Sequence, residues 1–393
     1  MFLMRFVALA LAVLALVSAA PRERYLAVWA MEANEFPGKG EGHDLLAVFD
    51  VGADFGRLVA TVPTQTHGMM AHHTNPQMPE DRLLFAEDFM ASEGHVFDFA
   101  DARRPRLVAS FAAAQGYTHM HSFATLANGH VLATYQLTGW DRDEPGALVE
   151  LDQHGRVVRA ASAAVPEIDP NIRPYGVLPL EKIDRVVTTS APMLTVKATT
   201  HVVQIWRLSD LKLLQTVDLA PSVNGAAAQS ADDAVLLEDG KTVMIKTAAC
   251  GLFTLTGLNA GQAQLQRVYD YGVRICSGVP VIAGHYWVEA LQSAHTVVVL
   301  DVKDPAHPTE VSHLYLGPGA FPHWLSLEPH TGNIVITGYG SLINRISFAT
   351  LDVESGSLTL DPRSIDLAHR TWADGWNGGV IPHGAVFFGP AYR

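Results

Sequence analysis

The residues most suited to chemistry in this sequence are histidines. Eighteen occur among the 393 residues, and several open short apolar stretches at comparable places along the chain: His72, His73, His119, His121, His323 and His383. Neutral imidazole is a ligand for copper, zinc, nickel and iron ions. Neither cysteine nor a carboxylate stands at these openings, so the sequence predicts an all-nitrogen metal centre if the fold brings the openings together.

Two of the openings contain paired histidines, which need not be equivalent. Side chains alternate between the two faces of a strand, so we expect one ring of each pair, His73 and His121, to face the metal. Their companions His72 and His119 either complete the ligand set or bond to it from behind. The alternative is that all these rings are polar residues that bind only water. We interpret other histidines, which lie in or beside turns, as exposed and without a role: His43, His95, His130, His154, His307, His330 and His369.

Two adjacent acids, Glu87 and Asp88, interrupt the otherwise apolar stretch from Leu83 to Phe89. One of them must face away from the solvated side of a strand. Either acid could be a base or an acceptor that supports a ligand histidine, or it could make a structural hydrogen bond at a sheet edge or bulge. No Ser/His/Asp motif, glycine-rich phosphate loop or cysteine-based metal site occurs with usable spacing.

The first 19 residues resemble an export signal. Arg5 precedes the uncharged stretch Phe6 to Ala20, and small residues at positions 17 to 19 favour cleavage after Ala19. We therefore expect residues 20–393 to form the mature protein in the periplasm or outside the cell. No other stretch of the sequence approaches the roughly 20 apolar residues of a membrane helix.

The two cysteines, Cys250 and Cys276, could form one disulfide in such an oxidising compartment. The bridge would close a loop of about 26 residues and contribute on the order of 3 kcal/mol in the chain-entropy account. The alternative is two buried thiols.

Composition restricts the possible partners. Charged residues make up 17% of the chain and hydrophobic residues 48%, which favours a large core over disorder. The net charge is -13 and no basic cluster occurs, so nucleic acid is not an expected partner.

Short β-branched and aromatic stretches, separated by Gly, Pro, Asp and Asn, predict an all-β protein. Units of four such stretches recur at about 46 to 60 residues, which is the size of a propeller blade. Six units are complete, whereas the first, Tyr25 to Val62, lacks a strand. The stretch from Gly379 to Phe388 could supply that strand and close the ring. We therefore predict a single domain over residues 20–393, a seven-bladed β-propeller closed by a C-terminal strand.

These histidine openings and their flanks resemble the selenium-binding protein and methanethiol oxidase family. The resemblance runs faintly over most of the mature chain and is sharpest at Ala71–Thr74, His121–Leu132, Leu300–Pro308, Leu351–Pro362 and Pro382-His383. It implies a seven-bladed propeller. By resemblance to the bacterial methanethiol oxidases, it further implies copper held by histidines and oxidation of a small thiol by O2 to aldehyde, sulfide and hydrogen peroxide. A redox metal suits this chemistry, whereas zinc cannot accept electrons.

Two positions depart from the family pattern. The selenium-linked cysteine of animal members is missing from Asn75–Asp81, and Gly384 stands where the family has glutamate. A distant branch with a different substrate is consistent with both departures.

The sequence leaves two classes of function open. One is an exported copper-dependent oxidase of a small thiol. The other is a non-catalytic propeller that binds a metal or a protein partner. They differ in whether the metal keeps an open coordination position and a route for substrate.

Overall fold

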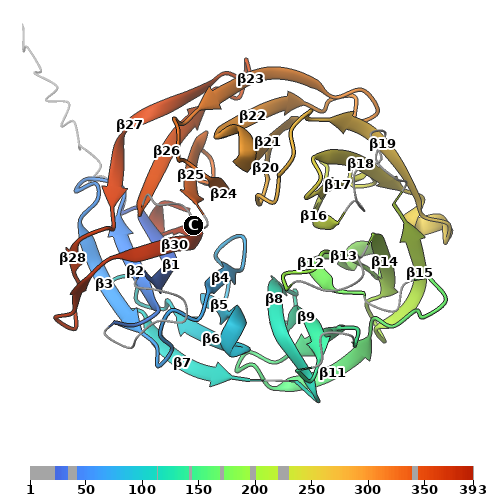
Figure 1. Cartoon of the computed structure of the whole chain (residues 1–393), viewed down its shortest axis with the longest axis horizontal. Helices are drawn as coiled ribbons and strands as arrows, with labels where there is room; N and C mark the ends of the chain where they lie inside the picture. The colour runs from blue at the N-terminus through green and yellow to red at the C-terminus, as the bar shows by residue number, and fades with distance from the viewer. Residues whose placement is uncertain are drawn as a thin grey trace, which may run out of the picture.

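Seven four-stranded antiparallel sheets surround a central axis in the computed structural model, and the chain is a seven-bladed β-propeller (Figure 1). The structure describes residues 23–33, 42–112, 114–140, 144–168, 172–194, 201–219, 230–338 and 344–392. The expected signal peptide lies outside these residues. The described helices are 3-10 turns of three residues, and in this part of the chain none has the length and apolar character that a bilayer crossing needs.

In six blades the strands follow chain order from the axis outward. The first three of these blades contain β4 (Ala71–Thr74), β5 (Leu83–Asp88), β6 (Glu93–Asp98) and β7 (Arg106–Phe111); β8 (Tyr117–Thr125), β9 (Val131–Thr138), β10 (Ala147–Leu151) and β11 (Val157–Ser162); and β12 (Pro174–Leu180), β13 (Arg185–Ser190), β14 (Val202–Arg207) and β15 (Lys212–Asp218). The next three contain β16 (Ala231–Leu236), β17 (Val243–Thr247), β18 (Gly251–Thr256) and β19 (Gln264–Asp270); β20 (Val281–Ala283), β21 (Tyr286–Leu291), β22 (Thr296–Asp301) and β23 (Thr309–Tyr315); and β24 (Pro322–Leu327), β25 (Asn333–Gly338), β26 (Arg345–Leu351) and β27 (Leu358–Asp366).

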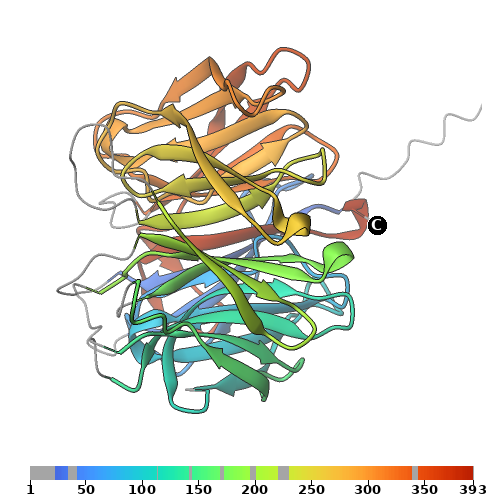
Figure 2. The same ribbon diagram turned by 90° about the vertical axis from the view of Figure 1, so that its right-hand side faces the viewer.

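The seventh blade combines both ends of the described chain, as predicted. Its order from the axis is β30 (Val380–Phe388), β1 (Tyr25–Glu32), β2 (Leu45–Asp50) and β3 (Leu58–Pro63), and β30 pairs antiparallel with β1. The remaining elements are the short pair β28 (Arg370–Thr371) and β29 (Asn377–Gly378), and the turns η1 (Phe89–Ala91), η2 (Glu181–Ile183), η3 (Leu258–Ala260), η4 (Gln292–Ala294) and η5 (Pro390–Tyr392). Figure 2 shows the blades from the side.

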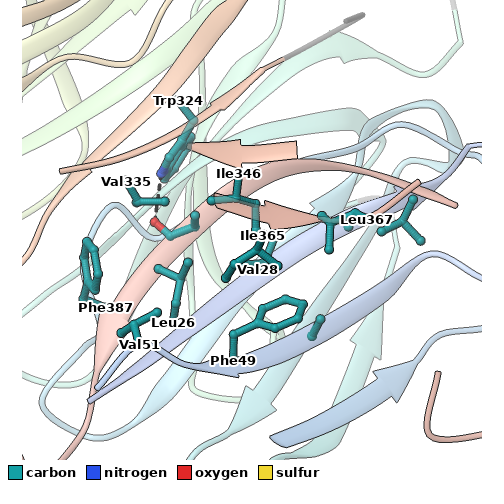
Figure 3. Packing of buried hydrophobic residues seen from close by; sticks show 14 of the residues in the cluster. Leu26, Val28, Phe49, Val51, Trp324, Val335, Ile346, Ile365, Leu367 and Phe387 are labelled. Atoms are coloured by element: carbon teal, nitrogen blue, oxygen red, sulfur yellow. Dashed lines mark hydrogen bonds between the residues drawn. The ribbon is translucent and has the colours of Figure 1, made fainter. Parts of the chain in front are cut away.

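The core lies between blades. Central strands such as β22 are covered on both faces by neighbouring blades, and the four inner residues of β22 are accordingly apolar and buried. The outermost strand β7 instead alternates exposed and half-buried residues. Figure 3 shows this packing at the closure of the ring, where Leu26 and Phe387 of the seventh blade belong to one cluster with Val335 and Ile346 of the preceding blade. The indole Nε1 of Trp324 donates to the Ala385 carbonyl at 2.9 Å across the same boundary.

The innermost strand of the β20–β23 blade is short. β20 has only three residues and begins at Val281. The preceding segment is held differently, because Cys276 is tied to Cys250 by a disulfide and Val279 forms a parallel bridge with Trp324 of the next blade.

Six innermost strands share an irregularity. Each shifts register against the strand that follows it in the blade, and such β-bulges redirect side chains. We call the residues within the shifts the bulge residues: His72 and His73 in β4, His121 and Ser122 in β8, Tyr175 and Gly176 in β12, Asp232 and Asp233 in β16, His323 in β24, and His383 and Gly384 in β30.

Side chains opposite the bulges link successive blades. In four blades, a second-strand residue donates to a main-chain carbonyl at or just before the innermost strand of the following blade. The pairs are Thr134 to Tyr175, Thr189 to Asp232, Lys246 to Gly278 and Thr337 to His383. These hydrogen bonds therefore hold the main chain at or beside the innermost strand across four of the blade boundaries.

Candidate metal centre

Four imidazoles from three innermost strands converge near the axis. His72 and His73 come from β4, His323 from β24 and His383 from β30. One nitrogen from each ring lies within 4.8 Å of those of the other three, and all four side chains are buried. Nitrogens on opposite sides of one ion would be at most about 4.2 Å apart at usual metal–nitrogen lengths of about 2.1 Å. Small ring rotations would therefore bring these four into a ligand set.

Alternation gave the expectation that His73 faces the axis and left His72 either in the ligand set or behind it, and the structure places both histidines in the cluster. Their rings are stacked, with centroids 4.3 Å apart and planes 4° from parallel. The bulge between Ala71 and Thr74 breaks the alternation on which the expectation relied.

His121 lies against the four rather than among them. Its ring centroid is 4.2 Å from that of His73 and 4.9 Å from that of His72. Its Nδ1 is 3.0 Å from Ser122 Oγ and 3.2 Å from the Tyr175 carbonyl oxygen, which orients the ring. The Nε2 atoms of His121 and His73 are buried, and neither has a hydrogen-bond partner among the described residues. Two such nitrogens beside one another suit a metal, because buried polar atoms otherwise find partners.

His119 is directed elsewhere. Its backbone has a positive φ of 58°, and its ring packs against Phe89 and Trp140 with centroid distances of 5.2 and 4.8 Å. Its Nδ1 lies 2.9 Å from Thr118 Oγ1. These contacts direct the His119 ring toward Phe89 and Trp140, and the left-handed backbone at this residue takes its side chain out of the regular alternation of β8.

The two adjacent acids separate. Glu87 Oε1 lies 3.3 Å from Nδ1 of His72 and accepts the His73 main-chain N–H at 3.1 Å, so Glu87 supports the cluster from behind. Asp88 faces the opposite side, where its Oδ2 accepts from Thr66 and lies 2.9 Å from Nε2 of His95. The expectation that Asp88 supports a ligand is not met by these contacts. His95 is fully buried in β6, so its interpretation as an exposed turn residue was wrong.

The environment keeps the rings neutral. Burial lowers the pKa of His72, His73 and His323 well below the usual value, and neighbouring imidazoles lower it further. Burial also lowers the pKa of His121 and of His383 to about 3. Neutral imidazole is the form that binds metal ions.

A cavity of about 470 Å³ adjoins the cluster and includes His73 and Trp324 in its wall. Its other walls come mainly from apolar residues of innermost strands, including Val177, Val281 and Leu325. A small molecule in this cavity would therefore lie beside the candidate ligands and against mainly apolar side chains.

The sequence analysis missed a buried charged group next to this site. Lys246 Nζ lies 3.1 Å from Asp232 Oδ2 and 4.0 Å from Glu289 Oε1. Burial alone would lower the pKa of Lys246, but the carboxylates outweigh it and the pKa is raised. The available signal was a charged residue in the centre of the apolar stretch Val243–Thr247, the same signal that identified Glu87.

Cys250 and Cys276 form a disulfide with a Cα–Cα distance of 5.1 Å. Both residues belong to one apolar cluster with Trp287, between the blade of β16–β19 and that of β20–β23. The bridge therefore joins neighbouring blades and has no contact with the histidines among the described interactions.

Comparisons with known proteins address the fold. No protein-family model and no curated sequence matches the chain. Among solved structures, a hypothetical selenium-binding protein from Sulfolobus tokodaii has a TM-score of 0.72 at 14% identity and covers 94% of each chain. The periplasmic gluconolactonase of Pseudomonas aeruginosa has a TM-score of 0.65 at 11% identity, covering 92% of this chain and 99% of its own. The Cps50 (Swd1) propeller domain of Myceliophteria thermophila has a TM-score of 0.56 at 12% identity, covering 76% and 88%. At these identities the likeness shows a shared β-propeller fold.

Proposed function

We propose that the histidine cluster binds copper and that the protein oxidises a small thiol, as the bacterial methanethiol oxidases do. The observation that carries this proposal is the convergence of four buried imidazoles, with His121 against them, beside an apolar cavity. The all-nitrogen donor set, neutral at physiological pH, suits copper. The likeness to the Sulfolobus tokodaii structure agrees with the sequence resemblance, although it extends only to the fold.

The overall reaction is balanced with one thiol, one O2 and one water, giving one aldehyde, one sulfide and one hydrogen peroxide. Two electrons pass from the carbon of the thiol to O2. Copper bound here would supply the redox chemistry and favour the thiolate form of the substrate. The chain holds the ligand rings through the β-bulges, orients His121 through Ser122 and the Tyr175 carbonyl, and encloses the substrate in apolar walls.

We further propose that the protein acts after export, in an oxidising compartment. The sequence of residues 1–19 and the disulfide between Cys250 and Cys276 support this location. N-terminal sequencing of protein recovered from the periplasm or medium should give Ala20 as the first residue, whereas an intact Met1 would contradict export by cleavage.

The test is metal analysis of full-length protein produced with copper, followed by assay of hydrogen peroxide and sulfide from methanethiol. Near-stoichiometric copper and both products are expected, and His73→Ala should lose copper and both products together while circular dichroism stays unchanged. Bound copper without oxidation of methanethiol or other small thiols would overturn the oxidase proposal in favour of a metal-binding module. Absence of bound metal would overturn both.

A further inference from the structure

The cavity beside the histidine cluster is too large for a substrate of the size of methanethiol. Its volume of about 470 Å³ is many times the roughly 10–15 Å³ that one water molecule needs by the same kind of measure. Methanethiol has only two non-hydrogen atoms and would leave most of this space to water, against walls that include Val177, Val281 and Leu325. Burying apolar surface there is favourable, so a ligand that fits the cavity has a substantial apolar part.

One carboxylate interrupts the apolar wall. Asp233 lines the same cavity as His73, and both are bulge residues of innermost strands, Asp233 in β16 and His73 in β4. The Asp233 Oδ2 atom is buried and has no hydrogen-bond partner among the described residues. Because a buried acceptor without a partner is costly, rotation of this carboxyl group toward a donor that a ligand brings into the cavity would be favourable.

Asp233 packs against the neighbouring blade and shares one cation with two other acids. An ideal Cβ on Gly176 would lie 2.7 Å from the Asp232 carbonyl oxygen and only in ordinary contact, at 3.4 Å, with Asp233 Oδ1, so glycine lets β12 approach β16 closely beside this carboxyl group. Lys246 is the partner of Asp232 and lies near Glu289, so the cation of this group is engaged by the other two acids. Burial raises the pKa of Asp233 to about 7, so its carboxyl group is partly protonated near neutral pH. A positively charged donor beside Asp233 would favour its carboxylate form.

We propose that the cavity binds an organic amine of about ten or more non-hydrogen atoms, with its apolar body against Val177, Val281 and Leu325 and its ammonium group on Asp233. If the proposed function holds, the physiological substrate is then a bulky aminothiol whose sulfur reaches the histidine cluster. The amine site itself depends only on the cavity and Asp233.

The test uses calorimetric titration of the full-length protein, freed of metal with a chelator, with straight-chain alkylamines from propylamine to decylamine and the alcohols of equal length. Affinity should rise about fourfold for each added methylene until the cavity is filled. Each amine should bind at least about tenfold more tightly than its alcohol, as expected for a hydrogen bond between charged groups. Affinity that does not rise with chain length would overturn the apolar site.

Variants separate the two parts of the proposal. Asp233→Asn is nearly isosteric and should abolish the preference for amines while alcohols bind as before; a preserved preference would refute the role of Asp233. Val177→Trp and Val281→Trp each fill the cavity and should remove the dependence on chain length. Val108→Trp, on the exposed face of β7, is the matched control and should behave as the unaltered protein. Because no metal and no turnover enters the measurement, failure here is distinguishable from failure of the proposed function.

Discussion

At the scale of single residues, hydrogen-bond partners rather than burial determine which imidazoles can bind a metal. His73 and His121 have buried Nε2 atoms without partners among the described residues, whereas His95, equally buried, is held by Asp88 and Ser110. An imidazole whose two nitrogens are both engaged is structural, and one whose free nitrogen faces other imidazoles is a candidate ligand.

Glu87→Gln should weaken copper binding by about 10- to 100-fold, because Glu87 contacts His72 and the main chain of His73 from behind. Competition titration with a chelator of known copper affinity measures the change. Asp88→Asn is the matched control at the adjacent position, and its contacts with Thr66 and His95 lie away from the cluster. It should lower stability and leave copper affinity unchanged. Equal loss of affinity in both variants would mean that Glu87 acts only through folding.

At the scale of elements, the innermost strands position the site through their bulges. A regular strand presents every second residue to one face, but the shift in β4 lets two consecutive histidines share a cluster. Side chains of the second strands then hold the main chain at or just before the next blade's innermost strand, as Thr189 and Lys246 do. Of these two side chains, Lys246 depends more on its partners, because it is a buried charge.

Lys246→Met should destabilise the fold by about 3–5 kcal/mol at pH 8, since it leaves Asp232 and Glu289 buried without their cation. The pKa of Asp232 is already raised to about 6 by burial, against the opposing effect of Lys246, and it should rise further in the variant. A carboxyl group with a raised folded-state pKa binds its proton more readily in the folded state, so the penalty should shrink as the pH falls from 8 to 5.

Urea unfolding of both proteins at pH 5, 6.5 and 8 measures this effect, and Lys241→Met, at an exposed position, serves as control. A penalty that is constant or greater at low pH would contradict the assignment of Lys246 as the counter-charge of these acids.

At the scale of the whole molecule, the ring is closed by strand pairing and could be reinforced by the metal. The seventh blade takes its innermost strand β30 from the C-terminal region and its other strands from the N-terminal region. The candidate ligands come from this blade and the blades on both sides of it, since His383 lies in β30, His323 in β24 and His72 in β4. A bound ion would therefore join three blades at the closure.

Ending the chain at Gly378 should prevent cooperative folding, because it exposes β1 and removes the acceptor of Trp324 at Ala385. Ending it at Gly389 keeps β30 and removes the Tyr392 contact with Glu328, so this control should fold with a loss of only about 1 kcal/mol. Thermal melting followed by circular dichroism distinguishes the two. A normal transition in the shorter protein would show that β30 is dispensable.

Copper at a free concentration of 100 times its Kd should stabilise the fold by about 2.7 kcal/mol, if it binds only the folded chain. Differential scanning calorimetry with and without a chelator measures the corresponding increase in Tm. His383→Gln, which removes the ligand contributed by β30, should reduce the increase, and an undiminished increase would place the copper elsewhere.

Local patterns in the sequence were sufficient for the fold. Short strands, turn residues and the blade-sized repeat predicted the seven blades, and the strand-like segment from Gly379 to Phe388 predicted the closure, because these features depend on alternation and on the need to cover sheet edges. The strand openings also identified His72, His73, His323 and His383 before any contact was known.

Only the tertiary structure decided which neighbours these residues face. Bulges placed both His72 and His73 in the cluster and a positive φ turned His119 away. The packing of β5 decided that Glu87, and not Asp88, faces the cluster. The tertiary structure also brought Lys246 of β17 and Asp233 of β16 close to the site. A bulge adds one residue to a strand and shifts the alternation of the side chains beyond it, and its position depends on packing against the neighbouring blades.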